Sequence, residues 1–177
     1  MIEESEEERP HRLDPNVHWS RATGYSELGM FDQARIELAM LPDDLPWGKQ
    51  KRAMMTEVLQ ALGDWTCMRK FAHELRMEFP QEVQWWVADA YATRRCESIE
   101  GARGILLEAL VHHYDDALIR YNLACYACKN GSFGECLDFL KEAVKRDAKF
   151  KQIAINDEDL MEVRDALNEM GWGDIVV

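Results

Sequence analysis

Two cysteines three positions apart, Cys125 and Cys128, form the motif of this sequence that comes nearest to a site of chemistry. A Cys-x-x-Cys pair is half of many zinc sites and is also the reactive pair of thiol–disulfide enzymes. A structural zinc needs two more well-spaced ligands, and the nearest histidines, His112 and His113, fall in a different predicted helix. A redox pair normally opens a helix, whereas this pair falls in the middle of one. We therefore interpret both residues as small, buried thiols, and we predict neither a metal nor a cofactor.

A second cluster of titratable side chains runs from His112 to Asp116. A metal-binding or acid–base role is one interpretation of two histidines beside two carboxylates. A solvated turn, with Asp115 or Asp116 as the N-cap of the next helix, is the interpretation that we prefer. The sequence contains no nucleophile elbow, and the run from Gly101 to Gly104 lacks the spacing of a phosphate loop. Because no catalytic constellation emerges, we do not predict an enzyme.

The balance of charges restricts the class of partner. The chain has 177 residues and a net charge of −12. A strongly acidic protein repels nucleic acid and anionic membranes, so we expect neither as a partner. Residues 1–14 contain six acidic and two basic side chains and almost no apolar ones, which predicts an acidic, disordered arm. Five cysteines, an odd number, and the lack of an apolar signal segment predict reduced thiols and a cytoplasmic location.

A period of 34 residues organises most of the chain. Gly29 and Gly63 are 34 residues apart, Gly131 lies twice that distance beyond Gly63, and Glu97 takes the intermediate position. Small side chains recur in the same frame, at Ala22, Ala34, Ala90, Ala102, Ala124 and Cys136. Small residues let two helices approach closely, and glycine permits a left-handed backbone where a helix ends. The period therefore predicts four helical hairpins stacked on a shared core, over residues 15–48, 49–82, 83–116 and 117–150.

At these residues the sequence resembles the tetratricopeptide repeat (TPR) family. The fourth unit carries the resemblance best, through Tyr121–Tyr126, Gly131–Phe133 and Leu137–Ala143, and the second and third units are degenerate. The resemblance covers roughly residues 15–149 and implies an all-α fold, a right-handed superhelical solenoid that scaffolds protein interactions. The segment from Lys149 to Leu160 looks like the closing segment of many bacterial arrays of this family, which implies a bacterial source.

Two segments depart from the repeat. Pro42 falls inside the second predicted helix of the first unit, so we expect that helix to end near Leu41. After the fourth unit, residues 151–156 are predicted to be a linker. Apolar residues between Asp157 and Met170 recur at three- and four-residue spacing, which predicts one amphipathic helix. Residues 151–177 are therefore predicted to be a linker and a C-terminal helix that caps the last repeat.

The resemblance also implies where a ligand binds, because in the family the first helix of each unit lines a concave groove. The slots implied here include Trp19, Thr23, Met54, Glu57, Tyr91, Arg94, Arg95, Tyr121, Asn122 and Lys129. Aromatic anchors with a basic end suit a protein or peptide that carries apolar and acidic side chains. Packing between neighbouring helices is the alternative for Tyr91 and Tyr121. The lysine and asparagine clamp of the family's chaperone-binding members is absent, so we do not expect binding to the C-termini of heat-shock chaperones.

Two functions are compatible with these features of the sequence. The first is an interaction module, an adaptor or a small cytoplasmic chaperone that holds a partner segment in its groove. A narrower version of it is a chaperone for a secreted or membrane-bound protein. The alternative is a self-associating structural scaffold without a peptide ligand, whose ends stack head to tail or as a two-fold homodimer.

Overall fold

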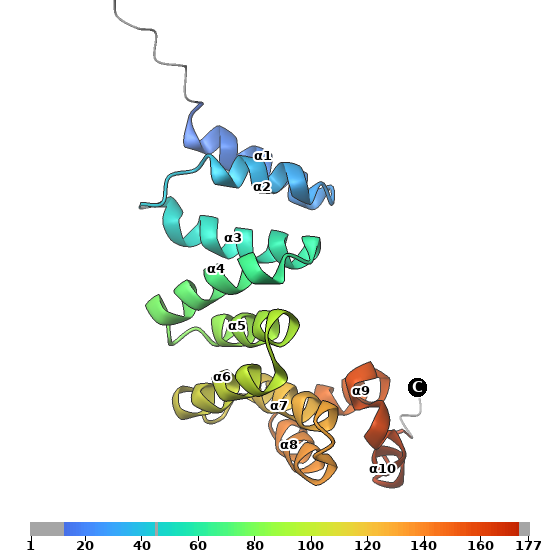
Figure 1. Ribbon diagram of the computed structural model, residues 1–177. Coiled ribbons are helices and arrows are strands. Elements are labelled where there is room, and N and C mark those ends of the chain that lie inside the picture. The colour runs from blue at the N-terminus through green and yellow to red at the C-terminus, as the bar shows by residue number, and fades with distance from the viewer. Residues whose placement is uncertain (1–12, 45, 174–177) are drawn as a thin grey trace, which may run out of the picture. The chain divides into compact units, whose positions relative to one another are not determined.

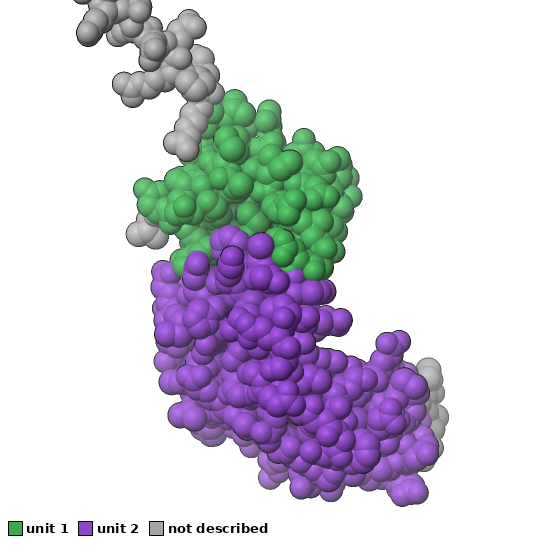
Figure 2. Space-filling view, viewed as in Figure 1, with its two compact units in different colours: residues 1–64 green, residues 65–177 purple. Residues whose placement is uncertain are grey.

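The computed structural model describes residues 13–44 and 46–173, which form helices joined by turns and contain no β-strand (Figure 1). The chain divides into two compact units, residues 1–64 and residues 65–177 (Figure 2). This division falls inside the predicted second hairpin, residues 49–82. Most of the predicted acidic arm, residues 1–12, lies outside the described residues, and so do residues 174–177 of the predicted cap region. Among the described helices, none is both long and apolar enough to span a membrane.

Unit 1 contains the helices α1 (Pro15–Glu27), α2 (Phe31–Ala39) and α3 (Trp47–Leu62). Asp14 caps α1 by accepting a hydrogen bond from the backbone N–H of Asn16, and Pro15 occupies the first helical turn, where its missing N–H is not needed. Gly29 and Gly63 have φ angles of 71° and 72°, a left-handed conformation that favours glycine. The two glycines of the 34-residue period therefore mark the turns after α1 and α3.

The segment after α2 follows an irregular path. Helix α2 ends at Ala39, close to the end that Pro42 predicts. Lys51 on α3 is only 8% exposed, and its ammonium group donates to the carbonyl oxygen of Leu41 at 2.8 Å and pairs with Asp43 at 2.7 Å. The buried lysine thus satisfies backbone and side-chain acceptors of the irregular segment and ties that segment to α3.

Unit 2 contains α4 (Trp65–Glu78), α5 (Val83–Cys96), α6 (Ile99–His112), α7 (Ala117–Lys129), α8 (Phe133–Arg146), α9 (Lys149–Asn156), the 3₁₀ helix η1 (Glu158–Val163) and α10 (Arg164–Glu169). From α4 to α9, each helix packs against the next. The small side chains of the period are completely buried in this unit, at Ala90, Ala102, Ala124 and Cys136. The all-α repeat fold predicted from the sequence is confirmed.

The turn at Glu97 explains how one repeat dispenses with glycine. Gly131 has a φ of 76°, whereas Glu97 has a φ of −130°, which any residue adopts. The next residue, Ser98, caps α6 by accepting a hydrogen bond from the N–H of Gly101 at 3.0 Å. The side-chain cap at Ser98 therefore accompanies a turn that needs no left-handed residue.

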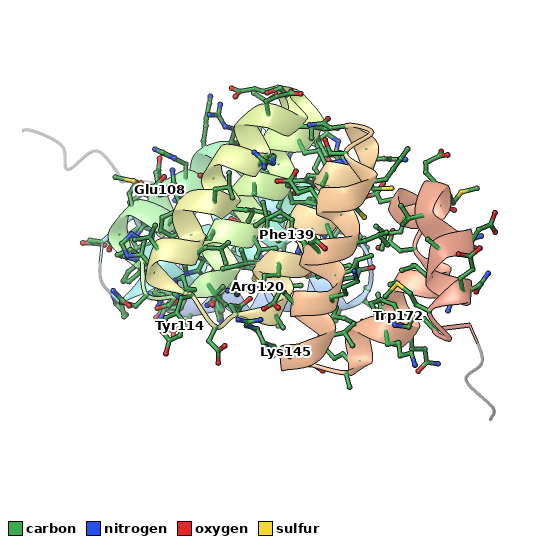
Figure 3. The ribbon with its side chains drawn as sticks, turned by 90° about the horizontal axis from the view of Figure 1, so that it is seen from below. Glu108, Tyr114, Arg120, Phe139, Lys145 and Trp172 are labelled. Carbon is green, nitrogen blue, oxygen red and sulfur yellow. The ribbon has the colours of Figure 1, made fainter. Side chains whose placement is uncertain are left out.

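The C-terminal end of unit 2 differs from the prediction. The predicted linker, residues 151–156, belongs to helix α9, in which Phe150 and Ala154 lie one turn apart and are both buried. The predicted single capping helix is instead η1 followed by α10. Leu160 and Leu167 of these two helices are completely buried, and Trp172 beyond them is 7% exposed (Figure 3). We call residues 149–173 the C-terminal cap.

Candidate protein-interaction surface

Four predicted binding residues lie in unit 1. The ring centroids of Trp19 on α1 and Trp47 on α3 are 5.7 Å apart, so part of the Trp19 ring packs against Trp47 within unit 1. The hydroxyl group of Thr23 donates to the carbonyl oxygen of Trp19 at 3.0 Å, one turn earlier along α1. Met54 is half-buried on α3, whereas Glu57 is exposed. Of these four side chains, Glu57 is therefore the most accessible to a ligand.

Arg94 of unit 2 binds a carboxylate of its own chain. Its guanidinium group donates two hydrogen bonds to Asp159 in η1, one of them 2.7 Å long, and the two side chains are only 14% and 25% exposed. The ring of Tyr126 lies 5.4 Å from the guanidinium carbon. Hydrogen bonding from Arg94 lowers the pKa of Asp159 below its ordinary value, and the same bonds raise the pKa of Arg94. The charge of Arg94 is therefore compensated within the unit.

Tyr121 packs against the same part of the cap. Its hydroxyl group donates to Asp157 at 2.5 Å, and its ring stacks on Phe150 with centroids 4.7 Å apart. Tyr121 is 6% exposed, and burial, with the hydrogen bond to Asp157, raises its pKa far above the ordinary value. Lys129 lies 3.7 Å from Asp159. These contacts support the packing interpretation of Tyr121.

Asp157 and Asp159 were not among the predicted binding residues. Their negative charge is opposite to that of Arg94 and Lys129. This was the only indication in the sequence that these side chains could pair. However, 65 residues separate Arg94 from Asp159. The apolar pattern of the predicted helix over residues 157–170 did not indicate where that helix packs against the repeats. Two of the three cations predicted to receive an acidic ligand, Arg94 and Lys129, are in fact compensated by the cap.

Arg95, the next residue of α5, has different surroundings. Its guanidinium carbon lies 5.4 Å from the ring of Trp65 and 5.1 Å from the ring of Tyr91, and it donates a hydrogen bond to the Tyr91 hydroxyl at 3.0 Å. The two rings meet edge to face, with centroids 5.6 Å apart. Arg95 is exposed, and no carboxylate among the described residues lies within ion-pair distance of it. We call Trp65, Tyr91 and Arg95 the Arg95 cluster.

Asn122 lies on α7, and its side chain forms a hydrogen bond within that helix. The side-chain amide donates to the carbonyl oxygen of Leu118 at 2.9 Å, one turn earlier along the helix. Asn122 is nevertheless half-exposed, while Leu118 is 38% exposed. Both residues therefore leave surface on α7 that a ligand can contact.

One cysteine beside the cap, Cys125, lies close to two carboxylates. Ligand atoms of Cys125, Asp157 and Asp159 lie within 4.8 Å of one another, a donor set of the kind that binds divalent cations. Arg94 and Tyr121 already bind the two carboxylates, and burial, followed by the nearby Asp157 charge, raises the pKa of the Cys125 thiol. Hydrogen bonds from Arg94 and Tyr121 hold these two carboxylates within the packing of the cap, and the absence of a metal stays a prediction.

The turn from His112 to Asp116 also serves packing. His112 stacks on Trp86 with ring centroids 5.4 Å apart. Asp116 accepts a hydrogen bond from the N–H of Ile119 at 2.9 Å and caps α7, as the preferred interpretation of this turn predicts. The exposed ring of Tyr114 lies in the same turn (Figure 3).

A cleft of about 260 Å³ opens between α4 and the end of α5. Its lining residues are Thr66, Arg69, Lys70, His73, Cys96 and Glu97. Arg69 pairs with Glu97 and donates to the Thr93 hydroxyl at 3.1 Å, while His73 lies 3.3 Å from the buried carboxylate of Asp89. Because Arg69 and His73 are engaged with acceptors of the chain, the cleft offers fewer open contacts than the Arg95 cluster.

These observations define the class of the protein by its fold. Helical hairpins with small residues at their contacts, glycine turns in a 34-residue frame and a C-terminal cap make this chain a TPR-like helical repeat protein.

Solved structures with a similar fold include MamA proteins. The crystal structure of MamA protein superposes with a TM-score of 0.69 at 10% identity and covers 88% of this chain and 86% of that chain. MamA 41-end from Desulfovibrio magneticus RS-1 gives a TM-score of 0.67 at 13% identity, over 92% of this chain and 97% of that chain. No family model and no curated protein matches the sequence. At such identities the similarity shows a shared fold.

Proposed function

We propose that the chain is a protein-interaction module, an adaptor or a small cytoplasmic chaperone of bacterial origin, that holds a segment of a partner protein. The observation that carries this proposal is the Arg95 cluster, an exposed arginine with two aromatic rings on a TPR-like repeat. Arginine and aromatic side chains are the residues that dominate the energetics of protein interfaces. The similarity of fold to the MamA proteins supports an interaction scaffold of this kind.

The test is capture of a partner by the purified chain from lysate of the native host, followed by a binding measurement with that purified partner. We expect Tyr91→Ala combined with Arg95→Ala to weaken the affinity roughly tenfold or more, because central aromatic and arginine contacts carry most of the binding free energy. Thermal unfolding should change little, because Tyr91 is only half-buried and Arg95 is exposed.

A matched control removes the same two residue types elsewhere in unit 2. Tyr114→Ala combined with Arg103→Ala deletes a 75% exposed tyrosine and an arginine that pairs with Glu135. We expect this control to bind the partner as the unchanged chain does. Equal binding by the unchanged chain and the Tyr91/Arg95 variant would exclude the cluster as the binding surface.

A self-associating scaffold is the second candidate, and exposed apolar side chains favour it. In unit 1, Leu28, Ile36 and Met40 are 75%, 62% and 48% exposed. In unit 2, Ile153 and Met161 of the cap are 43% and 56% exposed. Sedimentation equilibrium at micromolar concentration should then show a dimer or larger species that Ile36→Glu with Met40→Glu dissociates. A monomer at every concentration would contradict the scaffold.

A further inference from the structure

Adjacent arginines of α5 face different surroundings. Successive residues of an α-helix are rotated by about 100°, so the side chains of Arg94 and Arg95 leave the helix in different directions. Arg94 reaches η1 and binds Asp159, whereas Arg95 lies exposed against the rings of Trp65 and Tyr91. Among the described residues, a carboxylate therefore pairs with the arginine at position 94, and none pairs with the arginine at position 95.

The arginines around Arg95 emphasise this difference. Within the described part of unit 2, these arginines pair with carboxylates: Arg69 with Glu97, Arg76 with Asp89, Arg94 with Asp159, Arg103 with Glu135 and Arg146 with Asp115. Arg120 donates to the backbone carbonyl oxygens of Asp116 and Tyr114. In a chain of net charge −12, Arg95 is thus an exposed guanidinium group that has no carboxylate at ion-pair distance among residues 13–44 and 46–173.

The rings also restrict how the Arg95 side chain moves. Stacking over aromatic faces and the hydrogen bond to the Tyr91 hydroxyl hold the guanidinium group in one region of space. A side chain that is already ordered loses less conformational entropy when it binds a ligand. Its planar group keeps further N–H donors, and two parallel N–H donors match the two oxygens of a carboxylate.

The chain itself contains an example of this recognition. Arg94, one residue away, binds both oxygens of Asp159, a residue from a distant part of the sequence. Hydrogen bonding from Arg94 is the largest cause of the lowered pKa of Asp159, and the charge of Arg95 adds a smaller contribution in the same direction. Arg95 and Arg94 therefore lie near the same acidic turn, but the cap occupies only Arg94.

We propose that Arg95, held against the rings of Trp65 and Tyr91, docks a carboxylate of the partner's bound segment, an inference that rests on the proposed function. The carboxylate belongs to an aspartate or glutamate side chain, or to the C-terminus of the partner. The rings of Trp65 and Tyr91 contact the apolar side chain next to it. The chain thus binds an acidic and apolar segment through a single preorganised arginine, while Arg94 and Lys129 remain bound to the cap.

The experiment is a titration of the full ¹⁵N-labelled chain, observed at the arginine Nε–Hε NMR signals. Arg95→Gln removes one signal and thereby assigns it. The probes are three peptides: acetyl-Leu-Asp-Phe-amide, its neutral isostere acetyl-Leu-Asn-Phe-amide, and acetyl-Leu-Asn-Phe with a free C-terminus. We expect at least one carboxylate peptide to shift the Arg95 signal saturably, with a Kd roughly tenfold lower than that of the neutral isostere.

Two variants separate this result from a general effect of charge. Arg95→Lys keeps the charge but loses the planar pair of donors, so we expect its Kd, measured from the remaining shifted signals, to rise several-fold. Arg35→Gln removes an exposed arginine of α2 and should leave the titration unchanged. A shift with the aspartate peptide assigns the site to an acidic side chain, and a shift only with the free C-terminus assigns it to a chain end. Equal shifts with all three peptides, or no shift of Arg95, would overturn the proposal.

Failure of this inference is distinguishable from failure of the proposed function. If the chain captures a partner that Arg95→Gln still binds with unchanged affinity, the carboxylate site is wrong and the interaction module stands. If no partner is captured from host lysate, the proposed function fails, and the peptide titration still decides whether Arg95 binds carboxylates.

Discussion

The C-terminal end of unit 2 is covered by its own chain, whereas the first repeat of unit 1 leaves apolar side chains in solvent. The cap buries Phe150, Leu160, Leu167 and Trp172 and places two carboxylates against Arg94, Tyr121 and Lys129. On α2 in unit 1, Ile36 is 62% exposed, and no described residue covers it.

This difference teaches how an array of repeats treats its apolar and charged surfaces. A terminal repeat has no further neighbour to cover its outer face, so that face is either capped or offered to another molecule. In unit 2 the cap supplies apolar side chains to the core and carboxylates to the cations beside it. The cations that remain open after capping, above all Arg95, are then the ones available to a partner.

Loss of a completely buried apolar side chain should have the largest effect on stability, and the cap contains such a side chain. Leu160 is completely buried, so Leu160→Ala should lower the free energy of unfolding by about 3 kcal/mol, through lost burial and the cavity left behind. Met161, the next residue, is 56% exposed, so Met161→Ala should change the free energy of unfolding by less than about 0.5 kcal/mol. Urea unfolding followed by circular dichroism measures both. Similar values for the two variants would mean that the cap is not part of the core.

Removal of the Asp159 charge should have the next largest effect. Asp159→Asn leaves Arg94, 14% exposed, without its carboxylate, so we expect a loss of about 2 kcal/mol in the same measurement. Asp138→Asn is the matched control, because Asp138 is 81% exposed and pairs with Lys141 at the surface. A loss no greater than that of the control would show that the cap does not depend on the Arg94 pair.

The effect of Asp159 should depend on pH. Its pKa in the folded chain lies below the ordinary value of 3.8, because the carboxylate accepts hydrogen bonds from Arg94. The pair therefore contributes stability above about pH 4, and this contribution disappears as the pH falls through the folded-state pKa. We expect the difference in unfolding free energy between the unchanged chain and Asp159→Asn to be full at pH 6 and smaller at pH 3. A difference that stays constant over this range would refute the linkage.

The smallest effect is expected at the uncovered face of unit 1. Ile36→Ser should change the free energy of unfolding by less than about 0.5 kcal/mol, because the Ile36 side chain is already mostly in solvent. Leu38 on the same helix is completely buried, and Leu38→Ala should cost about 3 kcal/mol. A large loss in Ile36→Ser would show that another part of the chain, or a second copy, covers this face.

Much of the fold could be predicted because its signals are local and repeated. Gly29, Gly63 and Gly131 adopt the left-handed turns that their spacing predicts. Asp116 caps α7, and α2 ends close to Pro42. Helix α9 was predicted as a linker although Phe150 and Ala154 already had helical spacing, because eight residues give a weak periodic signal. The use of a 3₁₀ helix for η1 left no signal of its own in the pattern of apolar residues.

The candidate site could be predicted only in part. The positions that line the groove in the TPR family include Arg94, Arg95, Tyr91 and Tyr121 in this sequence. Whether any of them binds a partner remains a prediction. The contacts of these side chains depend on where the cap packs. Asp157 accepts a hydrogen bond from Tyr121 and Asp159 accepts hydrogen bonds from Arg94, whereas Arg95 stays exposed. No local pattern distinguishes two adjacent arginines whose neighbours come from segments far apart in the chain.

The sequence by itself therefore determined the repeat, its turns and its small-residue contacts, because each depends on residues within one 34-residue frame. Only the tertiary structure decided which charges are compensated. An ion pair such as Arg94–Asp159 forms when packing brings two distant side chains within hydrogen-bond reach, and that geometry follows from burial of Phe150, Leu160 and Leu167 in the cap. The exposed position of Arg95, with no carboxylate at ion-pair distance among the described residues, became visible only after the cap was in place.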